Sequence, residues 1–194
     1  MGLFRRGDGG GGRVDWLIVG LGNPGEGYAR TRHNVGFEVA NRAAQRWGLA
    51  RAKKRYAGLF TDGRTGPGGP RVGVLLPQTY MNESGRAVSP ARGALGVEPD
   101  RVVVVHDEID LPFGTIQVRL GGGVAGHNGL KSVKEGLGSA NFHRVRVGVG
   151  RPESTDPEIV SAHVLGRFRE SDAEVRELVE RAADELDRLV AAAP

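Results

Sequence analysis

Short apolar runs alternate with helical patterns along most of the chain. Six runs bounded by glycine, proline or charged residues predict β-strands, at residues 16–20, 58–62, 72–76, 102–106, 115–120 and 145–150. Between these runs, apolar residues recur at helical spacing, which predicts helices over residues 34–48, 83–95 and 128–137. The segment 171–190 opens with a Ser171–Glu174 capping box and carries an apolar stripe, so it predicts the clearest helix.

The alternation of strands and helices predicts an α/β fold. We expect a single-domain α/β/α sandwich over residues 14–194, with helices covering a twisted, mixed and largely parallel sheet. A domain of this length can bury a sizeable core without disulfides. Residues 1–13 are glycine-rich and lack a hydrophobic pattern, so they predict a disordered N-terminal arm. The dense glycine and proline of residues 63–70 predict a surface turn.

The composition excludes several classes of protein. Because the chain has no cysteine, it has no disulfide framework, thiolate zinc site or cysteine nucleophile, which fits a reducing compartment. No apolar run approaches the roughly 18 residues that span a bilayer. The N-terminus also lacks an apolar stretch long enough for a signal peptide. We therefore expect a cytoplasmic protein that does not associate with a membrane.

The formal net charge of +4 is unevenly distributed. Residues 41–60 contain six basic residues and no acid, and residues 119–151 contain six basic residues and one acid. Residues 170–188 reverse this pattern, with eight acids and three arginines. Either basic stretch alone is compatible with a solvated surface, but the two together indicate a surface that binds a polyanion.

The loop after the first predicted strand contains the spacing Gly-x-Gly-x-x-Gly, which is shared with dinucleotide-binding loops. In such loops a helix follows at once, whereas here the first helical pattern begins near Asn34. The acidic residue at the expected separation, Glu38, lies inside that helix. The same spacing recurs at residues 121–126, and it arises easily in a chain with 32 glycines. The surroundings therefore argue against a nucleotide cofactor, and we expect no cofactor.

Polar residues gather where predicted strands end and predicted helices begin. In an open α/β sheet these ends can face one crevice, where ligands bind. A histidine there can accept a proton near neutral pH, and a carboxylate on its other nitrogen fixes its tautomer. The residues in such positions are Asn23, His33, Tyr80, Met81, Asn82, Asp107, His127 and Asn128.

Two other kinds of catalytic site are disfavoured. The chain has no Gly-x-Ser-x-Gly motif, and Ser84 and Ser132 lack the turn signature of a serine nucleophile. The five histidines form no i,i+4 pair and no His-x-His, so their spacing predicts no metal site. We interpret His106, His143 and His163 as structural residues.

Six ordered motifs resemble those of bacterial-type peptidyl-tRNA hydrolases, from residue 16 to near the C-terminus: GLGNPG, TRHNVGF, TYMNESG, HDEIDLP, GGGVAGHNGLKS and NFHRVRVGVGRP. The resemblance implies a monomeric esterase that works without metal or cofactor. Its substrate would be the ester between a peptide, or an N-blocked aminoacyl group, and the 3′-terminal ribose of tRNA. Its role would be to recycle peptidyl-tRNA that has dropped from ribosomes.

The resemblance also implies roles for single residues of the reaction centre. His33 matches the general base that activates water, and Asp107 matches the carboxylate that supports it. Asn23 matches an amide associated with distinguishing a blocked peptide from a free amino group. Asn82 and Asn128 match amides that position the substrate, and Asn128 or a neighbouring backbone amide is the candidate oxyanion donor.

Other residues match positions that bind the tRNA. Tyr28 and Tyr80 match positions that line the tRNA terminus, near Met81 and His127 of the substrate-binding motifs. The expected contacts are the acceptor end, the 5′ phosphate and the peptide backbone. Arg119 and Arg146 match basic positions that clamp the 5′ phosphate. Some relatives have a lysine at the position of Arg119.

The sequence departs from the family pattern in its glycine-rich loop, which has Val124 and Ala125 where relatives can carry histidine and glycine. A second hypothesis is an RNA-binding module without catalysis, supported by the same basic segments. In that case the polar residues at strand ends would be structural. The presence of both His33 and Asp107 argues for the enzyme instead.

Overall fold

A seven-stranded mixed sheet forms the centre of the computed structural model, which describes residues 12–124 and 126–192. The strand order is β2-β3-β4-β1-β5-β7-β6. The bounds are β1 Trp16–Gly20, β2 Lys53–Arg55, β3 Gly58–Arg64, β4 Arg71–Pro77, β5 Val102–Glu108, β6 Ile116–Leu120 and β7 His143–Gly148. Strands β4, β1, β5 and β7 run parallel, and the pairs towards both edges are antiparallel. The predicted mixed, largely parallel sheet is confirmed.

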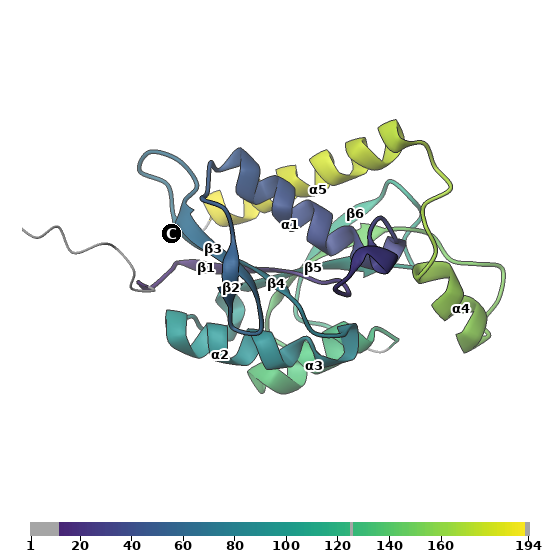
Figure 1. The fold of residues 1–194 in the computed structure, drawn as a ribbon, viewed down its shortest axis with the longest axis horizontal. Helices are drawn as coiled ribbons and strands as arrows, with labels where there is room; N and C mark the ends of the chain where they lie inside the picture. The colour runs from purple at the N-terminus through teal and green to yellow at the C-terminus, as the bar shows by residue number, and fades with distance from the viewer. Residues whose placement is uncertain (1–11, 125, 193–194) are drawn as a thin grey trace, which may run out of the picture.

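Helices cover both faces of the sheet (Figure 1). Helices α1 (Val35–Arg46) and α5 (Asp172–Ala191) lie over one face, and α2 (Gly85–Leu95) and α3 (Asn128–Leu137) lie over the other. A short helix, α4 (Pro157–Val164), stands beyond the carboxyl ends of the central strands. Four 3-10 turns complete the elements: η1 Glu26–Tyr28, η2 Arg32–Asn34, η3 Met81–Glu83 and η4 Pro99–Arg101. The α/β/α sandwich is therefore confirmed.

The sheet separates two apolar cores, and strand β5 contributes to both. Val103 and Val105 pack on the side of α1 and α5, whereas Val102 and Val104 pack on the side of α2 and α3. All four side chains are fully buried. A strand covered on both faces reads as a continuous apolar run, which explains the four consecutive valines.

Glycines at and just after the end of β1 allow α1 to approach this strand closely. A Cβ atom on Gly20 would collide with the backbone carbonyl of Gly36, and one on Gly22 would lie 2.7 Å from the Phe37 ring. The loop after β1 enters the 3-10 turn η1, and α1 begins only at Val35. These glycines therefore serve helix–sheet packing, in line with the argument against a dinucleotide-binding loop.

The structure differs from the sequence prediction in several elements. Strand β5 continues to Glu108, because Asp107 and Glu108 pair with Val147 and Gly148 of β7, so Asp107 lies within the strand and not after it. Strand β2 was not predicted, since its three residues are charged and exposed. Helix α4 was not predicted either, since no residue of α4 is buried and it shows no clear apolar stripe.

The predicted disordered arm, residues 1–13, falls almost entirely outside the described residues, and Gly12 and Arg13 have no regular secondary structure. The predicted surface turn is present between β3 and β4. Within the described ranges, none of the helices combines the length and the apolar character that crossing a bilayer requires.

Candidate active site

A cleft of about 810 Å³ opens at the carboxyl ends of β1, β4 and β5, between α3 and α4. With the exception of Tyr28, all the residues predicted to form the site line this cleft. They are Asn23, His33, Tyr80, Met81, Asn82, Asp107, Arg119, His127, Asn128 and Arg146. Tyr28 lies in η1 and is not among the lining residues, so its contact with the tRNA terminus stays a prediction.

The carboxylate of Asp107 lies at the base of the cleft and is 2 % exposed. Both of its oxygens lie 2.9 Å from Nδ1 of His33, which is carried by η2 at the start of α1. Burial by itself would raise the pKa of the Asp107 carboxyl, but the His33 and His127 imidazoles hold this pKa below its ordinary value. Asp107 is therefore ionised, and His33 donates its Nδ1 hydrogen to it.

A second imidazole binds the same carboxylate. Nε2 of His127 lies 2.9 Å from Oδ1 of Asp107, and the backbone N–H of Leu130 donates to Nδ1 of His127 at 3.3 Å. His127 is the N-cap residue of α3, so this contact joins the first turn of the helix to β5. Because its Nδ1 accepts a hydrogen bond, the neutral ring of His127 carries its proton on Nε2.

A third imidazole, that of His106, is fully buried beside this pair. Its Nδ1 donates to the backbone carbonyl of Asp107 at 2.7 Å, and its ring meets the ring of His127 edge-on with centroids 5.0 Å apart. Burial, with a smaller contribution from His127, lowers the pKa of His106 to about 3. His106 is therefore neutral at physiological pH and supports the backbone of Asp107.

An amide pair fixes the loop after β1. The side chain of Asn34 binds Asn23 twice, accepting from its backbone N–H and donating to its carbonyl, both at 2.9 Å. The backbone N–H of Met81 donates to Oδ1 of Asn23 at 2.7 Å. An N–H group can only donate, so the orientation of the Asn23 amide is determined, and its NH₂ group remains available to a ligand.

Arginines form a basic wall on the β7–β6 side of the cleft. In the pairing of β6 with β7, Arg119 lies opposite Arg144 and Gln117 lies opposite Arg146, so the three arginines share one face of the sheet. Arg144 is buried and donates to the carbonyls of Gly121 and Gly123 in the glycine-rich loop. Arg146 binds Gln117 and pairs with Glu108 at 3.1 Å. Arg119 is exposed and forms no ion pair with any described residue.

Three possible metal ligands, His33, Asp107 and His127, have donor atoms within 4.8 Å of one another. These residues are far apart in the sequence, so the spacing of histidines along the chain was not sufficient to find this group of possible metal ligands. A ligating nitrogen must be unprotonated, but His127 carries its proton on Nε2, the atom that faces Asp107. Both imidazoles are hydrogen-bonded to the Asp107 carboxylate, in an arrangement that does not suit a cation.

The serines considered at the sequence level are engaged in structural contacts. The hydroxyl of Ser84 is fully buried and donates to the carbonyl of Met81 at 2.7 Å. The hydroxyl of Ser132 accepts from the backbone N–H of Gly85 at 2.9 Å. Neither hydroxyl bonds to an imidazole of a described residue, so the geometry offers no serine–histidine pair.

Sequence reasoning did not identify two residues that shape the site. Asn34 was read as a helix start, and its double contact with Asn23 depends on a close approach that no local pattern reveals. Arg144 was read only as part of a basic stretch, although it binds the glycine-rich loop. Arg144 precedes the strand predicted at residues 145–150, whereas β7 begins at His143, so no sequence pattern indicated that its side chain is buried.

An imidazole supported by a buried carboxylate, in a basic cleft of an α/β fold, defines a site of the hydrolase type. The chain belongs to the peptidyl-tRNA hydrolase family, since the family model "Peptidyl-tRNA hydrolase" matches residues 17–193.

Individual proteins and structures agree with this assignment. The chain is 49% identical to the peptidyl-tRNA hydrolase of Mycolicibacterium smegmatis over 178 residues, which cover 90% of this chain and 91% of that protein. It is 50% identical to the one from Syntrophotalea carbinolica over 156 residues, 80% of each. The crystal structure of peptidyl-tRNA hydrolase from Acinetobacter baumannii superposes with a TM-score of 0.79 at 38% identity, covering 91% of this chain and 88% of that one.

Proposed function

We propose that this protein hydrolyses the ester between a peptide, or an N-blocked aminoacyl group, and the 3′-terminal ribose of tRNA, which returns the tRNA for reuse. The observation that carries the proposal is the His33–Asp107 pair at the base of the cleft. Membership in the peptidyl-tRNA hydrolase family supports the choice of substrate.

His33 acts as the general base. Its Nδ1 hydrogen is bound by Asp107, so the unprotonated nitrogen of the neutral ring is Nε2. Nε2 accepts a proton from water as the oxygen attacks the ester carbonyl, and Asp107 stabilises the imidazolium that forms. The protonated ring then gives its proton to the departing ribose oxygen. No metal or cofactor is required for either transfer.

The developing oxyanion is stabilised from the start of α3. Asn128 is the first residue of this helix, and it lines the cleft beside His127. A helix N-terminus favours negative charge through its unpaired N–H groups. Asn128 or a neighbouring backbone amide supplies the hydrogen bond, and one such donor typically contributes about 10²- to 10³-fold to a rate.

Asn23 distinguishes blocked from free amino groups by the direction of its hydrogen bond. Because Met81 binds Oδ1 of Asn23, only the NH₂ group of Asn23 faces a substrate. That group can donate to the carbonyl of a peptide or an acetyl group, but it repels a free ammonium, which also has only hydrogens to offer. The remaining cleft amides, Asn82 and Asn128, bind main-chain groups and so accept any peptide sequence.

The tRNA is held on the basic wall. Arg119 and Arg146 contact the 5′ phosphate, because guanidinium groups bind phosphate oxygens in pairs. A-form RNA is recognised by its shape, phosphates and 2′-hydroxyl groups, so the protein accepts tRNAs of different sequence. Tyr28 and Tyr80 contact the tRNA terminus, and Tyr80 is 61% exposed at the edge of the cleft.

The purified protein tests the proposal directly. We expect rapid hydrolysis of N-acetyl-aminoacyl-tRNA and slow hydrolysis of the same tRNA with a free amino group. In Asn23→Asp the shape is kept but the NH₂ group is lost, so the rate on the acetylated substrate should fall by about 10- to 100-fold, as for the loss of one hydrogen bond to a buried group. The exposed Asn141→Asp serves as the control. No hydrolysis of the acetylated substrate by the unmodified protein would contradict the proposed function.

A further inference from the structure

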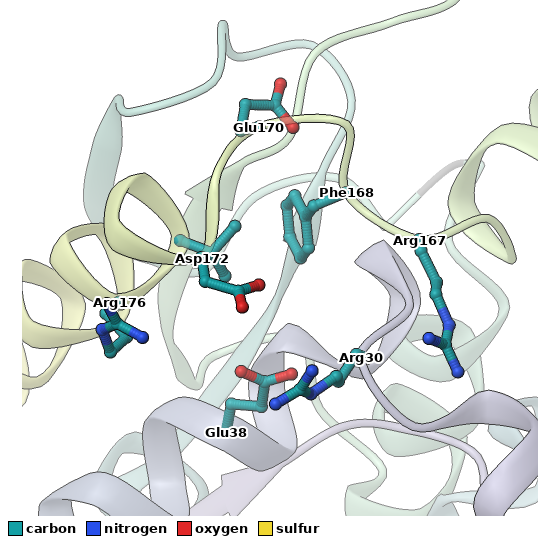
Figure 2. A pocket seen from close by; sticks show the side chains of 8 residues that line it. Arg30, Glu38, Arg167, Phe168, Glu170, Asp172 and Arg176 are labelled. Atoms are coloured by element: carbon teal, nitrogen blue, oxygen red, sulfur yellow. The ribbon is translucent and has the colours of Figure 1, made fainter.

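A second cavity, of about 220 Å³, adjoins the turn that carries His33 but shares no lining residue with the cleft. It lies between the η1–η2 segment, α1, the loop after α4 and the start of α5 (Figure 2). Backbone contacts close the cavity towards the cleft. The N–H of Arg32 donates to the carbonyl of Gly166 at 3.0 Å, and Thr31 and Arg167 form an isolated β-bridge.

Six charged side chains line this cavity, and their formal charges cancel. Three are arginines and three are acids: Arg30, Arg167, Arg176, Glu38, Glu170 and Asp172. None of the six forms an ion pair with another residue in the described part of the chain. Nearby on α1, by contrast, Arg42 and Arg46 both pair with Glu180 of α5. The opposite charges around the cavity therefore stop short of ion-pair contact with one another, although Arg30 lies beside Glu38.

The positions of these groups favour a ligand between them. In Figure 2 the carboxylates of Glu38 and Asp172 point towards each other, and the guanidinium of Arg30 lies beside Glu38. Burial raises the pKa of Glu38, and Arg30 opposes this rise. One oxygen of Glu170 is buried and has no hydrogen-bond partner among the described residues. Glu38 and Glu170 are therefore partly buried without an ion-pair partner among the described residues, whereas Asp172 is exposed at the mouth of the cavity.

The backbone at Arg30 is unusual as well. Its φ of 61° lies in the left-handed region, which residues other than glycine seldom adopt. Such conformations persist where surrounding contacts impose them, and they concentrate at binding sites. Here the hydroxyl and N–H of Thr31 both bind the carbonyl of Tyr28, which fixes the chain on either side of Arg30.

We propose that this cavity binds a small zwitterion that carries both an ammonium and a carboxylate group, such as an amino acid or a dipeptide. The ammonium lies between Glu38 and Asp172, and the carboxylate is bound by the arginines, whose forked guanidinium groups match it. A purely anionic ligand would compensate only the arginines, and a purely cationic ligand only the acids, so either would leave three charges of the other sign uncompensated. The volume equals that of roughly seven water molecules, which admits a dipeptide of small residues and excludes a nucleotide.

Side chains, and not the helix terminus, provide this recognition. One N-terminal amide of α5 is already engaged by the capping box, in which the Ser171 hydroxyl accepts from the backbone N–H of Glu174. Binding in this cavity is also independent of ester hydrolysis, since the cavity does not contact His33, Asp107 or the other residues of the cleft.

Titration of the full-length protein with glycylglycine, followed by NMR or calorimetry, tests the proposal. We expect saturable binding, and affinities at least tenfold weaker for N-acetylglycine, which lacks the ammonium, and for ethylamine, which lacks the carboxylate. The double variant Glu38→Gln, Asp172→Asn should bind glycylglycine at least tenfold more weakly. Arg176→Gln, which changes the carboxylate side of the cavity, provides a second variant.

Two controls separate the cavity from the cleft and from general charge effects. Glu98→Gln removes an exposed carboxylate that pairs with Arg92 on α2, and Asn82→Ala changes the cleft. Both should leave the affinity for glycylglycine unchanged. The proposal would be overturned by the absence of saturable binding, by equal binding of N-acetylglycine, or by binding that survives the double substitution or disappears in Asn82→Ala.

Discussion

At the scale of single residues, the site depends on how Asp107 is held. Its carboxylate receives hydrogen bonds from His33 and His127, and its backbone carbonyl receives one from His106. These contacts keep the carboxylate charged although it is almost completely buried, and they keep the His33 ring in one tautomer. The ring that we propose as the base is therefore oriented before the substrate arrives.

Asp107→Asn tests this arrangement. The amide keeps the shape of the side chain but removes the charge that stabilises the His33 imidazolium, so we expect the single-turnover rate to fall on the order of 10²- to 10⁴-fold. The affinity for tRNA should change little, because Asp107 lies at the base of the cleft. Asp110→Asn, which removes an exposed carboxylate of the same cleft, is the matched control. Equal losses in both variants would count against a specific role for Asp107.

His106 makes stability depend on pH. Its pKa of about 3 in the folded protein lies below the ordinary value of about 6.5 expected for the unfolded chain. Between these values the unfolded chain binds a proton that the folded protein does not, so stability is highest above pH 6.5 and falls as the pH drops. The slope from this group approaches about 1.4 kcal/mol per pH unit.

Denaturant unfolding between pH 7 and pH 4 measures this slope. In His106→Gln the unfolding free energy should vary less steeply with pH than in the unmodified protein, even though the variant is less stable overall. Asp107 contributes in the same direction but at lower pH: because its pKa is lowered in the folded protein, its stabilisation begins to be lost as the pH falls below the ordinary aspartate pKa of about 3.9. Parallel slopes for the two proteins would show that His106 is not kept neutral by burial.

The residues of the site were predictable where they stand at strand ends and helix starts. Asn23, His33 and Asp107 follow or end apolar runs, and the structure brings them into one cleft. Asn34 and Arg144 were missed, because their roles consist of contacts with backbone groups that are distant in sequence. Local patterns show which face a residue is on, but they do not show which carbonyl lies within its reach.

At the scale of elements, a buried arginine connects the turn of His33 to the helix α4. Arg32 is 5% exposed, and its guanidinium donates to the carbonyl of His163 at 2.9 Å and lies 5.8 Å from the centre of the Phe168 ring. His163 in turn binds the carbonyl of Gly150. Because residues of α4 line the cleft opposite α3, we expect this contact to influence the width of the cleft.

Arg32→Gln should weaken substrate binding more than chemistry. The contact with His163 is lost, which costs about 1–3 kcal/mol for an unpaired buried group, whereas the His33–Asp107 bond is not touched. We expect a KM raised severalfold, with a smaller change in kcat, and a lower melting temperature. Arg92→Gln on α2 removes an arginine remote from the cleft and should leave KM unchanged. A fall in kcat at constant KM would contradict this role of Arg32.

Elements that bury apolar residues were predictable from the sequence, and exposed elements were not. The capping box and apolar stripe of α5, and the apolar runs of β1, β4 and β5, depend on burial and therefore leave a periodic signal in the sequence. Strand β2 is exposed; it pairs with β3 through the backbone and places Arg55 over the Phe60 ring, so it leaves no periodic apolar signal. Helix α4 has an Asp156 cap and Pro157 at its start, but it buries no residue.

At the scale of the whole molecule, the two basic stretches have different surroundings. Arg42 and Arg46 of the first stretch pair with Glu180 of α5, and Arg46 also reaches Asp184 and Asp187. The acidic C-terminal segment thus neutralises part of the first stretch. Four arginines of the second stretch line the cleft; Arg146 and Arg151 pair with acids there, whereas Arg119 forms no ion pair with a described residue and is available to a polyanion.

Salt dependence of tRNA binding distinguishes the two arginines of the proposed phosphate clamp. Arg119 is exposed and unpaired among the described residues, so Arg119→Ala should lower the slope of log K against log salt concentration by about 0.7 to 1. Arg146→Ala should also weaken binding, but it leaves Glu108 without its partner, so the protein loses stability as well. Arg188→Ala, on α5, is the control, and an unchanged slope in Arg119→Ala would refute the clamp.

The central claim is that His33 activates water while Asp107 stabilises its charged form. Single-turnover cleavage of N-acetyl-aminoacyl-tRNA by His33→Ala, at a protein concentration that saturates binding, tests it most directly. The account predicts a rate about 10²- to 10⁴-fold below that of the unmodified protein, the usual contribution of a general base, with tRNA affinity retained. A rate close to that of the unmodified protein would contradict it.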